Sequence, residues 1–405
     1  MPRAPVRTGI LPGRMAKKTT KKSGTKRVRT IEGPSERQTL KVPAPVPLDS
    51  VIGHERALCQ LRAAMGSGRL HHAWIFHGPE GVGKFTTALA WAAVLLDPTS
   101  RPGLTGEIAP EPDSPTQRLL AAGMHPDLHV VCKELARFSD DSKVRDAKLA
   151  TIPKAVVEEH LIVPASRAPV MRSESRAGKV FIVDEAELLD RSPSNAPTQN
   201  AILKTLEEPA PGTIIILVTS SEDRLLPTIR SRCQRVAFAP LSDEAMRVWM
   251  SHAGLEADGA ERDWLLRMGQ GSPGRVLSLR ESGAYAWYTA IDSMLAEAER
   301  GVLPLTLGST MSKLVEDWAS AWVKEGEKQG ENRSKDAANR VGVRRMLSLV
   351  ADRARPGLVD PRRRDTAMQA IDAVARAQRE LDSNVQMKFV FEHLVAGLSS
   401  REAIY

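Results

Sequence analysis

The sequence predicts an α/β protein: a parallel β-sheet covered by helices on both faces, followed by helical regions. Between residues 47 and 240, apolar runs of strand length alternate with segments of helical pattern. Because polar residues do not interrupt these runs, they are typical of strands buried on both faces of a parallel sheet. Beyond about residue 240 no such run occurs. Aromatic residues make up only 4% of the chain, so we expect the helices to pack on aliphatic cores.

The expected elements follow one another in a regular order. Val51, Leu58, Leu61 and Met65 recur at helical spacing and predict a helix that stops at the glycines near residue 67. The remaining expected elements are a strand at 72–78, a helix at 83–96, strands at 129–132 and 179–189, a helix through 200–209 and a strand at 213–221.

Composition divides the chain into four expected regions. Residues 1–46 form a basic tail, and 47–240 carry the α/β pattern, with a Pro-rich insertion at 97–118. A small helical domain is expected at 241–280 and a larger all-helical one at 281–405.

The net charge of +8 is concentrated in the tail. Residues 1–43 hold twelve Lys and Arg against two Glu, which leaves the remaining chain with a net charge of −2. This tail is too polar to form a core, and we predict it to be disordered. It is either a solubilising arm or a weak electrostatic contact for DNA or RNA. Whether translation starts at Met1 or Met15 stays open.

Cysteine usage and hydropathy indicate the compartment. Cys59, Cys132 and Cys233 lie far apart, and no apolar segment follows the basic N-terminus. The longest apolar runs are far too short to span a bilayer. We therefore expect a cytoplasmic protein without disulfides and without membrane association.

The segment IFHGPEGVGKFTTALA (75–90) predicts a phosphate-binding loop. Gly78 to Lys84 fit the rule G-x-x-x-x-G-K, with a strand before them and a helix after them. The loop N–H groups, with Gly78, Gly81 and Gly83 shaping the turn, form an anion site together with the helix N-terminus. Lys84 would reach toward the outer phosphates of the nucleotide. The alternative is a glycine turn that binds nothing.

Phe85 departs from the rule at the position where a Ser or Thr hydroxyl binds magnesium. Thr86, the next residue along the chain, is a candidate cofactor-binding residue. One residue further along a helix rotates a side chain by about 100°, so Thr86 does not replace the missing metal ligand. We expect ATP or ADP to bind with weak magnesium coordination and impaired hydrolysis.

The segment FIVDEAE ends a predicted strand in Asp184 and Glu185. Asp184 would belong to the metal shell of a bound nucleotide, and Glu185 would orient and deprotonate an attacking water. A solvated helix start is the alternative for such a pair, and the glycine loop upstream argues against it.

Several further motifs resemble the clamp-loader branch of the AAA+ ATPases, and within it the delta-prime family of bacterial DNA polymerase III. The resemblance covers residues 47–280 well and 281–400 loosely. The motifs are VIGHERA (51–57), HHAWIFHGPEGVGK (71–84), HPD (125–127), NAILKTLEEP (200–209), the Thr219 strand end, Ser231-Arg232-Cys233 and GSPGRVLSL (271–279).

This resemblance implies an AAA+ P-loop core, a small helical lid and an all-α collar. It implies a place in a five-subunit ring of clamp-loader subunits that uses ATP to load a sliding clamp onto primed DNA. Thr219 takes the first sensor position and Arg275 the second. Arg232 corresponds to an arginine finger that reaches the nucleotide of a neighbouring subunit, with a surface ion pair as the alternative.

Two departures from the family are informative. Relatives commonly carry four zinc-binding cysteines before the HPD segment, but residues 97–118 contain no cysteine, so we predict no zinc and no metal site. Phe85 favours a stator that takes part in hydrolysis without performing it. The intact Asp184–Glu185 pair favours a gamma/tau-type motor subunit, and the basic tail leaves a DNA-binding, helicase-like AAA+ protein as a further alternative.

Overall fold

The computed structural model describes residues 42–67, 70–102, 108–139, 141–145, 150–171, 174–189, 196–255, 257–328 and 334–400. The basic tail predicted at 1–46 therefore lies almost entirely outside the described residues. Within the described residues, no helix is long and apolar enough to cross a membrane.

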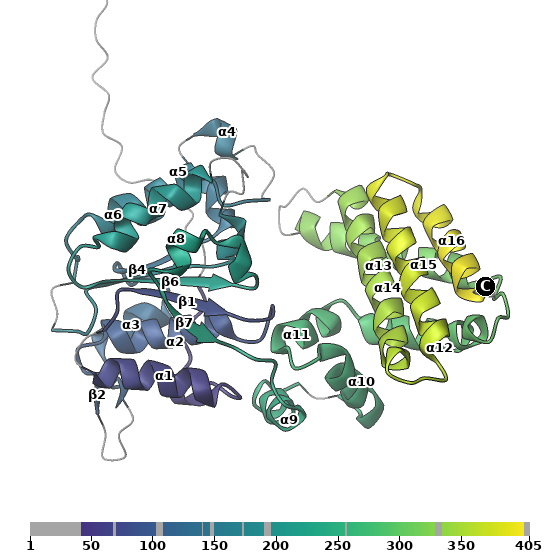
Figure 1. Ribbon diagram of the computed structural model, residues 1–405, viewed down its shortest axis with the longest axis horizontal. Helices are drawn as coiled ribbons and strands as arrows, with labels where there is room; N and C mark the ends of the chain where they lie inside the picture. Colours follow the sequence, from purple (N-terminus) through teal and green to yellow (C-terminus); the bar gives the residue numbers. More distant parts are fainter. Residues whose placement is uncertain are drawn as a thin grey trace, which may run out of the picture. The chain divides into compact units, whose positions relative to one another are not determined.

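The centre of the α/β region is a five-stranded parallel sheet (Figure 1). In spatial order its strands are β4 (Leu128–Val131), β5 (Lys179–Val183), β6 (Thr213–Thr219), β1 (Ala73–His77) and β7 (Gln234–Ala237). The four strands expected from the apolar runs are confirmed. β7 was not expected, because only Val236 of this edge strand is buried and the run is too polar to predict a strand.

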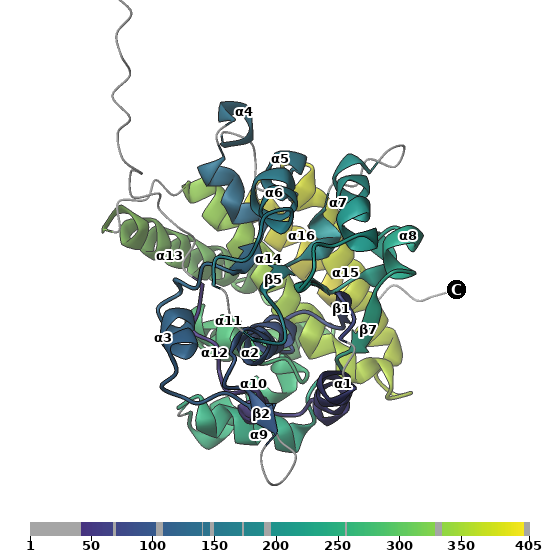
Figure 2. The same ribbon diagram turned by 90° about the vertical axis from the view of Figure 1, so that its left-hand side faces the viewer.

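Side chains alternate between the two faces of the sheet and form two cores. Trp74 and Phe76 of β1 pack in one core, whereas Ile75 packs in the other. Figures 1 and 2 show α1 (Glu55–Gly66), α2 (Lys84–Leu96) and α3 (Pro115–Ala121) on one face. The other face carries α5 (Lys154–Val157), α6 (Val163–Ala165), α7 (Pro197–Glu207) and α8 (Pro227–Arg230). The predicted α/β class is confirmed.

Two predicted elements need correction. The first helix begins at Glu55, so Val51 precedes it, although Leu58, Leu61 and Met65 do form its buried face. The insertion at 97–118 was expected to be a loop, but it contains the short strands β2 (Arg101–Pro102) and β3 (Ile108–Ala109) and the start of α3.

The insertion is anchored by the buried carboxylate of Asp97. This side chain accepts hydrogen bonds from Ser114 Oγ at 2.5 Å, Gln117 Nε2 at 2.9 Å and Thr99 N at 2.9 Å. In the part of the chain that the structure describes, no group of three or more His, Cys, Asp or Glu side chains is placed to hold a metal ion.

The chain also contains short elements, all in the α/β region except η6, which lies among the C-terminal helices. They are η1 (Leu48–Ser50), η2 (Lys133–Phe138), α4 (Ser142–Arg145), η3 (Glu158–Ile162), η4 (Ala186–Leu188), η5 (Glu222–Arg224) and η6 (Arg355–Leu358).

Every described regular element after β7 is helical. Three helices come first: α9 (Asp243–His252), α10 (Gly259–Gly269) and α11 (Pro273–Glu281). They are followed by α12 (Ala284–Glu299), α13 (Leu307–Lys328), α14 (Lys335–Ala354), α15 (Arg364–Asp382) and α16 (Met387–Ser399). α13 to α16 pack against one another, and the contact between α13 and α16 closes them into a bundle. Most buried residues of these helices are aliphatic, as the composition predicts, but Trp264, Tyr285 and Tyr288 form an aromatic cluster among them.

Candidate nucleotide site

The glycine loop connects β1 to α2. Gly78 has a φ of +146°, and a Cβ there would collide with the carbonyl of Phe238, so only glycine fits this position. Lys84, the first residue of α2, turns its ammonium back toward the loop. Its Nζ donates to the carbonyls of Gly78 at 2.7 Å and Pro79 at 2.6 Å. The loop therefore holds its cation at the point where the strand ends.

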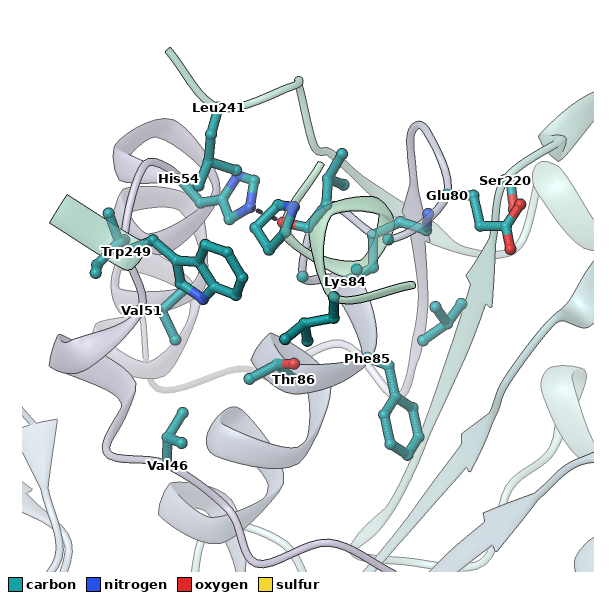
Figure 3. A pocket seen from close by; sticks show the side chains of 18 of the residues that line it. Val46, Val51, His54, Glu80, Lys84, Phe85, Thr86, Ser220, Leu241 and Trp249 are labelled. Atoms are coloured by element: carbon teal, nitrogen blue, oxygen red, sulfur yellow. Dashed lines mark hydrogen bonds between the residues drawn. The ribbon is translucent and has the colours of Figure 1, made fainter. Parts of the chain in front are cut away.

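A cavity of about 700 Å³ lies beside this loop and has two chemically different ends. One end, where Figure 3 shows Val51, Leu241 and Trp249, is largely apolar. The other end, where Glu80 and Ser220 lie, is polar, and Lys84, Asp184, Glu185, Glu187 and Thr219 also line the cavity. In Figure 3, Val51 and Trp249 lie on one side of Lys84, and Glu80 and Ser220 lie on the other. An apolar end next to a cationic loop is the arrangement that a nucleotide base and its phosphates require.

Phe85 and Thr86 leave the first turn of α2 in different directions (Figure 3). Phe85 is half-buried and packs against the core, whereas Thr86 is exposed. Both line the cavity. The position next to Lys84 therefore presents an aromatic ring where a metal ligand would need an oxygen.

Asp184 follows β5 directly, and its backbone N–H donates to Val131 O at 2.9 Å. Burial raises the pKa of Asp184 to about 6, and the negative charges of Glu185 and Glu187 act in the same direction. Burial also lowers the pKa of Lys84, but the carboxylates of Glu187 and Asp184 oppose that effect. The polar end of the cavity thus combines one cation with several carboxylates.

Glu185 is held by Lys133, a residue that no local sequence motif indicates. Lys133 Nζ of η2 donates to Glu185 Oε2 at 2.5 Å. The backbone of Glu185 is left-handed, with a φ of +47°, which is unusual for a residue with a side chain. Burial would lower the pKa of Lys133, but the hydrogen bond and charge of Glu185 outweigh it and raise that pKa. The carboxylate of Glu185, the candidate water-orienting group, is therefore already paired with Lys133.

Glu187 is a third carboxylate in the cavity, and it was also missed. Its side chain is only 8% exposed, and its Oε1 accepts from Ser220 Oγ at 2.7 Å and from Ser220 N at 3.2 Å. Its Oε2 is buried and has no hydrogen-bond partner. Burial would raise the pKa of Glu187, but hydrogen bonds, above all the one from the Ser220 hydroxyl, hold it below its ordinary value. Glu187 therefore connects Ser220, which follows the C-terminal end of β6, to the cavity.

The N-terminus of α11 packs directly on the glycine loop. Gly274 N donates to Gly81 O at 2.8 Å, and Ser272 Oγ donates to Glu80 O at 2.9 Å. A Cβ on Gly274 would lie 2.9 Å from the Cα of Gly81, so both positions need glycine for this approach. On the other side of the loop, buried His54 contacts Val82 O through Nε2 at 2.7 Å. His54 and the N-terminus of α11 therefore both hold the glycine loop in place.

Neither predicted arginine lines the cavity; Arg275 was expected there, whereas Arg232 was expected to reach the nucleotide of a neighbouring subunit. Arg275 starts on α11, but its guanidinium pairs with Asp352 of α14, and it does not line the cavity. Arg232 follows α8, is 37% exposed, and pairs with Glu207 of α7 at 2.6 Å. Both assignments rest on the family resemblance and stay predictions.

Of the remaining predicted residues, the structure brings most together. The cavity is lined by Gly81, Gly83, Lys84, Thr86, Asp184, Glu185 and Thr219, and Gly78 contributes the carbonyl that accepts from Lys84. The residues missed from the sequence are Lys133, Glu187, His54 and Trp249. Glu187 had a local signal, since it stands two residues beyond Glu185, whereas Trp249 comes from α9 and had none.

A parallel sheet whose first strand passes through a glycine loop into a helix, with carboxylates at the end of a second strand, defines a P-loop protein. Residues 53–242 match the sequence profile of the family described as DNA polymerase III, delta subunit. The chain is 30% identical over 256 residues to DNA polymerase III subunit delta' of Pseudomonas aeruginosa, which covers 63% of this chain and 68% of that protein. The chain belongs to the delta-prime family of DNA polymerase III subunits.

Other relatives match over shorter parts of their length. Identity is 30% over 191 residues with DNA polymerase III subunit delta' of Bacillus subtilis, covering 47% of this chain and 49% of that protein. The chain is also 30% identical over 244 residues to DNA polymerase III subunit gamma/tau of Mycobacterium tuberculosis, which covers 58% of this chain and 36% of that protein. The match to gamma/tau is thus confined to about a third of that longer protein.

Proposed function

We propose that this chain is the delta-prime-type subunit of a clamp-loader ring: a stator with an impaired ATP site of its own that supplies Arg232 to the nucleotide of a neighbouring subunit. In this role it takes part in loading a sliding clamp onto primed DNA. The delta-prime relatives support this assignment by their names as DNA polymerase III subunits.

Phe85 is the observation that carries the stator role. When a nucleotide is bound, its magnesium ion neutralises charge on the transferring phosphate, and a P-loop hydroxyl helps to hold that ion. Phe85 provides no oxygen, and Thr86 is exposed in a different direction (Figure 3). The ion pair from Lys133 to Glu185 adds to this effect, because a carboxylate engaged at 2.5 Å is a poorer acceptor for the proton of a water.

The position of Arg232 supports action on a neighbour. Its guanidinium lies outside the cavity of its own chain and is partly exposed, so a second subunit can approach it. Glu207 holds it in place at 2.6 Å, and an exposed ion pair of this kind costs little to exchange for a phosphate contact.

A gamma/tau-type motor subunit is the second candidate. It is favoured by the complete Asp184–Glu185 pair and by the similarity to the gamma/tau subunit of M. tuberculosis. Phosphate release by the purified chain separates the two roles. The stator role predicts no magnesium-dependent turnover above background, measured alongside the Lys84→Ala variant, and robust turnover that Lys84→Ala abolishes would establish the motor.

A further inference from the structure

We infer that the cavity selects nucleoside diphosphates over triphosphates, and that the buried carboxylate of Glu187 is the residue that sets this preference. The inference rests on the proposed nucleotide site and specifies its ligand. It follows from the hydrogen bonds and ion pairs that the polar groups in and near the cavity already form.

The groups that hold the first two phosphates of a nucleotide are present. A P-loop uses its backbone N–H groups for these phosphates and its lysine for the outer ones. Here Lys84 is buried at the start of α2, and the glycine turn is kept in shape by His54 and Gly274. The apolar end, with the half-buried indole of Trp249, suits a nucleotide base.

Lys84 and Thr219 line the cavity, but several other groups that would hold a third phosphate are engaged elsewhere or missing. The backbone N–H and hydroxyl of Ser220, at the sensor end of β6, both donate to Glu187 Oε1. Arg275 pairs with Asp352. Phe85 supplies no metal ligand with which to neutralise the added charge.

Glu187 also opposes a third phosphate directly. Its Oε2 is buried without a hydrogen-bond partner, and its side chain lines the cavity with that of Lys84. A carboxylate in such a poorly hydrated place repels further negative charge more strongly than it would in water. The expected result is a site that accepts the shorter phosphate chain.

Titration calorimetry of the full-length chain with ADP and with ATP tests this inference. Each nucleotide is titrated once with magnesium and once with EDTA. We expect ADP to bind about tenfold or more tightly than ATP in both buffers. In Glu187→Gln, which keeps the hydrogen-bond acceptor for Ser220 but removes the charge, we expect ATP affinity to rise about tenfold while ADP affinity changes little.

Glu159→Gln is the matched control, because Glu159 is also a partly buried glutamate that accepts a serine hydroxyl, from Ser139 at 3.1 Å, but it lies outside the cavity. This variant keeps the wild-type preference. Equal affinities, tighter binding of ATP in either buffer, or an unchanged ratio in folded Glu187→Gln would each overturn the inference.

The result also separates this inference from the proposed function. A chain that prefers ADP but hydrolyses ATP rapidly would refute the stator role and leave the selectivity standing. A chain that binds ATP and ADP equally and hydrolyses neither would refute the selectivity and leave the stator role standing. Binding of neither nucleotide to the wild type or to Glu187→Gln would overturn the selectivity and the nucleotide site together.

Discussion

The guanidinium of Arg275 on α11 is paired with the carboxylate of Asp352 on α14, a side chain that is only 3% exposed. Ser348 Oγ, at 3.3 Å, and Arg355 Nη1, at 3.4 Å, contact the same carboxylate. Because α11 also touches the glycine loop through Gly274, this pair connects the C-terminal helical bundle with the candidate nucleotide site. The first turn of α11 therefore contacts both the glycine loop, through Gly274, and the bundle, through Arg275.

Removing the charge of Asp352 should destabilise the protein. In Asp352→Asn the guanidinium of Arg275 loses its buried counter-ion, and we expect the free energy of unfolding to fall by about 1–3 kcal/mol. Chemical denaturation measures this free energy of unfolding. Asp382→Asn is the control, since Asp382 pairs with Arg344 at an exposed site and should cost about 0.5 kcal/mol or less. Equal effects of the two variants would contradict a structural role for the pair.

The contact between Gly274 and Gly81 should not tolerate a side chain. Gly274→Ala places a Cβ 2.9 Å from the Cα of Gly81, and we expect a loss of about 1–3 kcal/mol in stability together with weaker nucleotide binding. Gly259→Ala, at the start of α10, places its Cβ in open space and should be neutral or stabilising by up to about 1 kcal/mol. Denaturation and nucleotide titration of both variants test this close approach.

The raised pKa of Asp184 should appear in the pH dependence of stability. Burial raises this pKa to about 6, so the folded protein binds a proton more tightly than the unfolded chain. The resulting stabilisation is complete at a pH below about 4, the ordinary value for Asp, and is lost as the pH rises through about 6. Asp184→Asn should therefore be more stable than wild type at pH 8, by about 1–3 kcal/mol.

That advantage should shrink as the pH is lowered toward 4, and denaturation curves at several pH values measure it. Asp223→Asn, an exposed aspartate of η5, is expected to show no such trend. An advantage of Asp184→Asn that stays constant between pH 4 and pH 8 would contradict the assignment of the raised pKa to this carboxyl group.

Restoring the hydroxyl at position 85 should restore magnesium sensitivity. In Phe85→Ser we expect nucleotide affinity to depend on magnesium, because a first-turn hydroxyl can ligate the ion. Hydrolysis should stay slow until Lys133 is also replaced, as in Phe85→Ser/Lys133→Ala, since Lys133 engages Glu185. Phe85→Ala removes the same packing without adding an oxygen, so magnesium sensitivity in that control would rule out the explanation.

The proposed arginine finger predicts an effect in trans. Arg232→Ala should leave assembly with the other subunits intact but lower the ATPase rate of the reconstituted complex by about 10³-fold at the neighbouring site. Arg235→Ala removes another exposed arginine of the same region, paired with Glu222, and should leave the rate unchanged. If the two variants behave alike, Arg232 is a surface ion-pair residue only.

Local patterns predicted those parts of the protein that depend on neighbouring residues in the chain. The uninterrupted apolar runs predicted β1, β5 and β6, because a strand buried on both faces leaves no polar alternation. A shorter apolar run predicted β4, an edge strand in which only Val131 is buried. The edge strand β7 was not predicted, because only Val236 is buried there and the strand has no apolar run. Proline and glycine in residues 97–118 concealed the β2–β3 strand pair and the Asp97 hydrogen bonds that anchor the segment.

The sequence by itself determined four of the five strands of the sheet, the glycine loop with Lys84, and the loss of the hydroxyl at Phe85, because each is encoded within a few consecutive residues. Only the tertiary structure decided how the charges pair. Lys133 reaches Glu185 across 52 positions of the chain, and Arg275 reaches Asp352 across 77. Such pairs depend on the relative placement of whole strands and helices, which residue spacing does not specify. That placement turned a predicted loop and two carboxylates into a cavity that both Glu187 and Lys84 line.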